Sequence, residues 1–121
     1  MTPKAYHKHF IDNFVKLTPS IGHRLLSEEG IYSKAPAYRW INEIIRDMSP
    51  EQIEAIQAIV AHEREAALHD ALVFINDEIC ANETQIVHQG QPMYIDEDGL
   101  TLYQEYVGRI AGDGWDDIFK D

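Results

Sequence analysis

The side chains best suited to chemistry in this chain are His62, Glu65 and His69. Their spacings of three and four residues place them on one face of a helix. Glu65 and His69 form an i, i+4 pair, as in helical zinc sites. The local sequence HEREAALH departs from the HExxH motif, so a site would need a further ligand, with His23 and His88 as candidates. A metal-binding protein or metal-assisted enzyme is therefore an alternative, and our main expectation is no metal and no cofactor.

Arg64 is unusual because it projects close to the middle of the apolar face of the same helix. A guanidinium in that position needs an ion partner and hydrogen bonds. We expect a buried ion pair for Arg64, with Glu43, Glu105 and the aspartates of the tail as candidate partners. An anionic ligand is the functional alternative.

The C-terminal part of the chain combines several carboxylates with a tryptophan, Trp115. Exposed acidic side chains attract a basic protein surface, and a tryptophan among them can anchor the contact. We expect the partner-binding set to be Asp96, Glu97, Asp98, Asp113, Trp115, Asp116 and Asp117.

The net charge of −11 is unevenly distributed. Residues 1–46 hold seven basic and four acidic residues, and residues 47–121 hold three basic and seventeen acidic residues. This acidity argues against direct nucleic-acid binding, which needs Lys and Arg near phosphates. No apolar run approaches the roughly 20 residues of a membrane span. A single cysteine, Cys80, is typical of a reducing compartment, so we expect a cytoplasmic protein.

One long helix, from Ser49 to about Cys80, is the strongest structural signal. Ser49, Pro50 and Gln52 form an N-terminal capping pattern. The apolar face predicted for this helix consists of Ile53, Ile56, Val60, Ala67, Ala71 and Ile75. A helix of about 30 residues would be about 45 Å long, so we expect either a break around 62–66 or a segment covered by a partner.

The remaining elements are shorter. Apolar periodicity and Ser/Thr-Pro starts predict helices at about 3–17, 19–29, 35–48 and 100–111, and a small β-hairpin within 86–95. The tail after Gly112 contains Trp115, Ile118 and Phe119, so we expect it to dock. We interpret His7 and His9 as solvated and Trp40 as a core residue. The predicted fold is mainly α, a single domain over 1–121 built as a compact bundle of about five helices with a small hairpin.

No Ser/His/Asp arrangement or glycine-rich phosphate loop is present, so we lean against an enzyme. In size and charge the chain resembles bacterial immunity, antitoxin or nuclease-inhibitor proteins. The preferred hypothesis is a non-catalytic protein-binding or inhibitory module that engages a basic partner. A homo-oligomeric structural protein, for example a homodimer formed through the long helix and exposed aromatic residues, is the third hypothesis.

Overall fold

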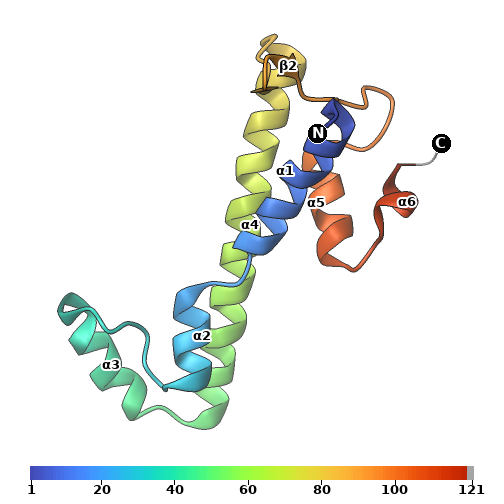
Figure 1. Cartoon of the computed structure of the whole chain (residues 1–121). Coiled ribbons are helices and arrows are strands. Elements are labelled where there is room, and N and C mark those ends of the chain that lie inside the picture. Colours follow the sequence, from blue (N-terminus) through green and yellow to red (C-terminus); the bar gives the residue numbers. More distant parts are fainter. Residues whose placement is uncertain (120–121) are drawn as a thin grey trace. The chain divides into compact units, whose positions relative to one another are not determined.

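The computed structural model describes residues 1–119, and these are mainly helical (Figure 1). The helices are α1 (Pro3–Leu17), α2 (Ile21–Glu28), α3 (Arg39–Arg46), α4 (Pro50–Ala81), α5 (Leu102–Ile110) and α6 (Trp115–Ile118), with a 3₁₀ turn η1 (Pro36–Tyr38) before α3. Strands β1 (Val87–His88) and β2 (Gln91–Pro92) form an antiparallel pair. The prediction of a mainly helical fold with a small hairpin is confirmed.

The chain divides into two compact units. Unit 1 comprises residues 1–17 and 67–121, and unit 2 comprises residues 18–66. The single-domain organisation expected from chain length stays a prediction. No helix in residues 1–119 is both long and apolar enough to cross a membrane.

Helix α4 begins with the predicted capping pattern. The backbone N–H of Gln52 donates to Ser49 Oγ at 3.2 Å, and the Ser49 N–H donates to Gln52 Oε1 at 2.9 Å. The helix then runs for 32 residues without interruption, which excludes the first of the two alternatives, a break at 62–66. The second alternative, a segment covered by a partner, stays a prediction. After Pro50 the sequence of α4 holds no glycine or proline and is rich in Ala and Glu, which favour helix. The boundary between the two units nevertheless falls in this region, at 66/67.

The core of unit 1 forms where α1, α4, α5 and the loop after β2 meet. Its buried residues are Ile11, Leu72, Met93, Leu102 and Tyr106. Helices α1 and α5 lie side by side (Figure 1). Apolar periodicity places Tyr6, Phe10, Phe14 and Leu17 on one face of α1; the first three pack at the edge of this core, whereas Leu17 is 51% exposed.

The hairpin has the register Val87↔Pro92 and His88↔Gln91. Its turn residues, Gln89 and Gly90, both have positive φ (51° and 78°), as a tight type I′ turn requires. The His88 ring stacks on Tyr6 of α1 at a centroid distance of 4.1 Å. The hairpin is therefore supported by a helix, because two such short strands have little stability alone.

In unit 2, the buried residues are Leu25, Leu26 and Ile45. Helix α2 begins two residues later than predicted, because Ser20 rather than Thr18 caps it by accepting from the His23 N–H at 3.0 Å. Trp40 on α3 is 61% exposed, so the prediction of a core tryptophan was wrong. Ile44, one turn further along α3, is 52% exposed on the same side of the helix.

The tail docks as predicted, as far as the structure describes it. Thr101 caps α5 in a capping box with Gln104, and Gly112, with φ +98°, follows its end. Helix α6 then packs on α5, and Phe119 at its end is 9% exposed. Unit 1 is therefore closed by its own C-terminal segment.

Candidate functional site

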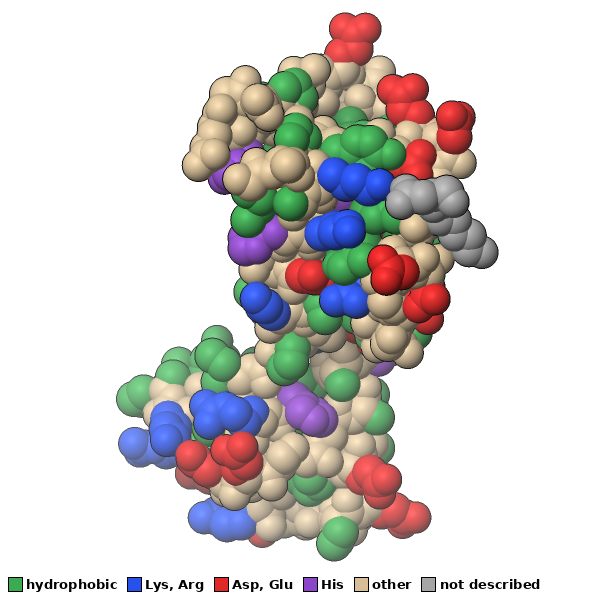
Figure 2. Space-filling view, turned by 45° about the vertical axis from the view of Figure 1, so that its right-hand side comes forward, with side chains coloured by type: hydrophobic (Ala, Val, Ile, Leu, Met, Phe, Trp, Pro, Cys, Tyr) green, Lys and Arg blue, Asp and Glu red, His purple; other side chains and the backbone are tan. Residues whose placement is uncertain are grey.

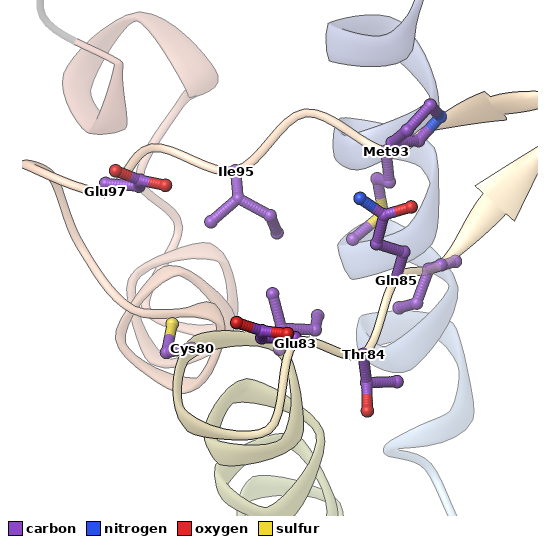
Figure 3. A pocket seen from close by; sticks show the side chains of 10 residues that line it. Cys80, Glu83, Thr84, Gln85, Met93, Ile95 and Glu97 are labelled. Atoms are coloured by element: carbon purple, nitrogen blue, oxygen red, sulfur yellow. The ribbon is translucent and has the colours of Figure 1, made fainter.

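An open groove in unit 1 lies between the end of α4, the hairpin and the loop that follows β2 (Figure 3). Its volume is about 1020 Å³. Several of its lining residues are apolar, and two, Glu83 and Glu97, are acidic. The complete lining is Ile79, Cys80, Glu83, Thr84, Gln85, Ile86, Pro92, Met93, Ile95 and Glu97. Met93 and Ile95 come from the loop after β2, and Cys80 and Glu83 face them from the end of α4 (Figure 3).

The end of α4 sets one rim of this groove. The Asn82 and Thr84 N–H groups both donate to the Glu78 carbonyl, at 3.2 and 3.0 Å, which closes the helix. The residue between them, Glu83, has a φ of +57°, in the left-handed region. Glycine, or sometimes asparagine, usually occupies this position, because the left-handed conformation costs most other residues about 1 kcal/mol or more. Glu83 is thus held at the rim in a conformation unfavourable for its residue type.

The groove carries negative potential from two sources. Its charged lining residues, Glu83 and Glu97, are both acidic and both exposed. The C-terminal end of a helix also has a partial negative charge, which Lys or Arg in the last turn normally offsets. The last turn of α4 has no basic residue. Both sources favour a cation in the groove.

A small cavity of about 60 Å³ adjoins the groove, because Cys80, Ile95 and Glu97 line both. His7 and Glu105 lie at its inner end and are 0% and 1% exposed. His7 was predicted to be solvated, and this was wrong; His9 is exposed, as predicted.

The His7 ring is fully occupied by hydrogen bonds. Its Nδ1 lies 2.6 Å from the Tyr94 carbonyl oxygen, which can only accept, so Nδ1 carries a proton and donates it. Its Nε2 lies 2.5 Å from Glu105 Oε2, so one proton is held between these two atoms. Neither nitrogen remains available to a substrate. The pair therefore connects α1, α5 and the loop at Tyr94.

A second network fastens the tail. Asp12 accepts from Arg109 Nε at 2.8 Å and from the Trp115 indole N–H at 3.0 Å. The Trp115 ring stacks on Phe119 at a centroid distance of 5.2 Å. Lys4 and Lys8 place their ammonium groups 4.9 and 5.6 Å from the Phe119 ring centroid. In Figure 2, Lys and Arg side chains lie beside hydrophobic ones in the upper part of the face shown.

The predicted partner-binding residues fall into two groups at opposite ends of α5. Asp96, Glu97 and Asp98 precede the helix, whereas Asp113, Trp115, Asp116 and Asp117 follow it. Nine helical residues separate them by about 13 Å at about 1.5 Å per residue. Gly99 allows the first group to fold tightly, since a Cβ there would meet the Asp96 carboxylate at 2.3 Å.

Several of these residues also have roles inside the chain. The Trp115 indole contacts Asp12, Phe119 and Arg109 within the chain, and its role as an anchor for a partner stays a prediction. Asp117 accepts from the Gly114 N–H at 2.9 Å and caps α6. Glu97 is the only member of the predicted set that lines the groove.

The structure does not assemble the metal site that the sequence offers as an alternative. Among residues 1–119, no group of three or more His, Cys, Asp or Glu side chains is placed to hold a metal ion. His62 is exposed, Glu65 is half-buried, and His69 contacts Asp70 at 3.3 Å and Tyr103.

Arg64 is exposed, so the prediction of a buried guanidinium was wrong. Arg64 lies two turns before Ala71, and Ala71 is exposed as well. The inward side of α4 in unit 1 consists of Leu68, Leu72, Ile75 and Ile79 and not of the predicted Ala67 and Ala71. Ile75 of the predicted face does pack against the core, and Ile53, Ile56 and Val60 are half-buried, so the prediction was wrong at Ala67 and Ala71. An ion pair of Arg64 outside the core stays a prediction.

Sequence reasoning missed His7, Glu105 and Glu83. A signal existed for the first two: His7 lies one turn before Ile11, and Glu105 follows Leu102 by three residues, so each is an ionisable residue on an apolar helix face. Their pairing across the chain had no local signal. The left-handed conformation of Glu83 depends on where α4 ends, which sequence patterns locate poorly.

Comparison with known proteins gives one match. The model of a family of unknown function (DUF6547) matches residues 1–117. No curated protein and no solved structure matches the chain.

Proposed function

The chain belongs to this family of unknown function, and we propose that it is a non-catalytic protein-binding or inhibitory module whose acidic C-terminal half engages a basic partner. One observation carries the proposal. Residues 67–119 contain eleven acidic side chains and one basic side chain, Arg109, and Arg109 pairs with Asp12 of α1. Among residues 1–119, no salt bridge engages Asp96, Glu97, Asp98, Asp113, Asp116 or Asp117.

An acidic surface without counter-charges attracts a basic protein and speeds its association. The same charge repels nucleic-acid phosphates, so the partner is a protein. We place the module in the cytoplasm, in line with its one free cysteine, Cys80, which is exposed. Immunity and antitoxin proteins provide the functional model, because they block a partner by covering its surface and need no active site.

The test is capture of proteins from source-cell lysate on the immobilised chain at about 50 and about 300 mM salt. We expect retention of one or a few basic proteins at low salt and their loss in the Asp98→Lys/Asp116→Lys variant. Glu54→Lys/Glu63→Lys in unit 2 makes the same charge change on other exposed acidic residues and is the matched control. Equal retention by all three proteins would contradict the proposal.

Self-association is a second candidate, favoured by one observation. Trp40 and Ile44, spaced one helical turn apart on α3, are 61% and 52% exposed. Exposed apolar pairs of this kind often mark an interface between subunits. Sedimentation at micromolar concentration tests this candidate, and a monomer at all concentrations would exclude it.

A further inference from the structure

We propose that the groove of unit 1 binds an extended basic segment of the partner, with an aliphatic side chain on its floor and Lys or Arg side chains at Glu83 and Glu97. This inference rests on the proposed function and names the place and the chemistry of the contact. Three properties of the groove carry it: its apolar floor, its acidic rim and its size.

The floor provides apolar contact area. Ile79, Ile86 and Ile95 are half-buried and Met93 is 6% exposed, and all four line the groove. They also pack in or against the core of unit 1, so the floor is held in place. An apolar side chain of the partner would cover surface that the chain itself leaves open to water.

The rim selects cations. Both charged groups of the lining are carboxylates, and the end of α4 adds its partial negative charge. Within residues 1–119, neither Glu83 nor Glu97 forms a salt bridge. The chain itself leaves both carboxylates available for a cationic partner.

Glu83 gives the strongest reason to assign a role to the rim. Its φ of +57° would suit glycine, and glycine would also remove a negative charge from the negative end of α4. Two effects therefore make glutamate unfavourable for helix stability at this position: its left-handed conformation and its negative charge. A contact made by its carboxylate explains why the residue is acceptable there.

The size of the groove favours a peptide segment over a single small cation. A volume of about 1020 Å³ lies at the upper end of the range for drug-sized ligands. A polyamine would satisfy the two carboxylates and would leave the isoleucine floor uncovered. A segment in which an aliphatic residue lies between two basic residues would pair with the two carboxylates and also cover the isoleucine floor.

Three acetylated heptapeptides with the central sequences Lys-Leu-Lys, Lys-Gly-Lys and Glu-Leu-Glu, together with spermine, serve as probes. Binding to the full chain is measured by amide NMR shifts. We expect the Lys-Leu-Lys peptide to shift the amides of residues 79–86 and 93–97, the Lys-Gly-Lys peptide to bind several-fold more weakly, and the Glu-Leu-Glu peptide not to bind. Spermine binding as tight as that of Lys-Leu-Lys, or shifts outside the groove, would overturn the inference.

Variants separate the groove from the general acidic surface. Glu83→Gln/Glu97→Gln should weaken Lys-Leu-Lys binding about tenfold, whereas Glu54→Gln/Glu63→Gln, with the same charge change on exposed carboxylates of unit 2, should weaken it less than about twofold. Alkylation of Cys80, the only cysteine, should block the peptide while leaving thermal unfolding unchanged. If partner capture is lost in Asp98→Lys/Asp116→Lys and persists in Glu83→Gln/Glu97→Gln, the groove is excluded and the proposed function stands. If neither variant affects capture, the proposed function itself fails.

Discussion

His7 Nε2 lies 2.5 Å from Glu105 Oε2, which joins two residues 98 positions apart in the buried centre of unit 1. The same ring donates from Nδ1 to the Tyr94 carbonyl at 2.6 Å. One imidazole therefore connects α1 with α5 and with the loop that forms the groove, so the groove depends on this contact for its shape.

Removing one member of this pair should strongly destabilise the protein. We expect His7→Ala to lower the free energy of unfolding by about 3–5 kcal/mol, because Glu105 would remain buried without its partner. Urea unfolding followed by circular dichroism measures the change. His9→Ala, on the exposed side of α1, is the control and should stay within about 0.5 kcal/mol of wild type. A His7→Ala protein as stable as the control would show that the pair contributes little to the free energy of unfolding.

Glu83→Gly should separate stability from binding. Glycine accepts the left-handed conformation, so we expect the free energy of unfolding to stay the same or to rise by about 1 kcal/mol. Affinity for the Lys-Leu-Lys peptide should fall, because one carboxylate of the rim is gone. Glu83→Ala removes the same charge and keeps the strained conformation, so it should lose affinity with no gain in stability. A marked destabilisation of Glu83→Gly would show that the glutamate side chain serves the fold.

The two tryptophans should report two different environments. Trp115 donates to Asp12 and stacks on Phe119, whereas Trp40 is 61% exposed. In Trp115→Phe, the remaining emission from Trp40 should lie at long wavelength and be strongly quenched by acrylamide. In Trp40→Phe, the emission from Trp115 should lie at shorter wavelength and be quenched several-fold less. Equal quenching of the two variants would mean that the tail is not docked in solution.

The Asp12 contacts should hold α6 in place. Asp12→Ala removes the acceptor of both Arg109 and Trp115, so we expect a loss of about 1–3 kcal/mol and faster amide exchange in residues 113–119. Asp70→Ala removes an exposed carboxylate of α4 and is the matched control. Unchanged exchange in the tail of the Asp12→Ala protein would contradict the assigned role.

Local signals in the sequence predicted most of the helices. The cap at Ser49, the glycine after α5 and the apolar residues of the tail each specify nearby structure, and the structure agrees with them. The predictions that failed concern which helix face is buried. Arg64 was assigned to the core because it projects onto an apolar face, and Trp40 because it is a large aromatic residue, yet both are exposed. Periodicity identifies an amphipathic helix, but contacts with other elements decide how far its buried side rotates.

The candidate site was predictable only in part. Glu97 was in the predicted binding set because acidic composition is visible in a sequence. The groove requires the end of α4 and the loop at Met93 and Ile95 to face each other, and no local pattern encodes that relation. His7 and Glu105 show the same limit, because their pairing depends on tertiary structure.

The left-handed conformation of Glu83 has an evolutionary consequence. Mutation and selection for folding alone would steadily replace glutamate at this position with glycine or asparagine. Members of the family that have lost the partner should therefore have drifted to those residues at the end of α4, whereas members that keep it should retain a carboxylate. The residue at position 83 would then act as a marker of which relatives still share a binding partner.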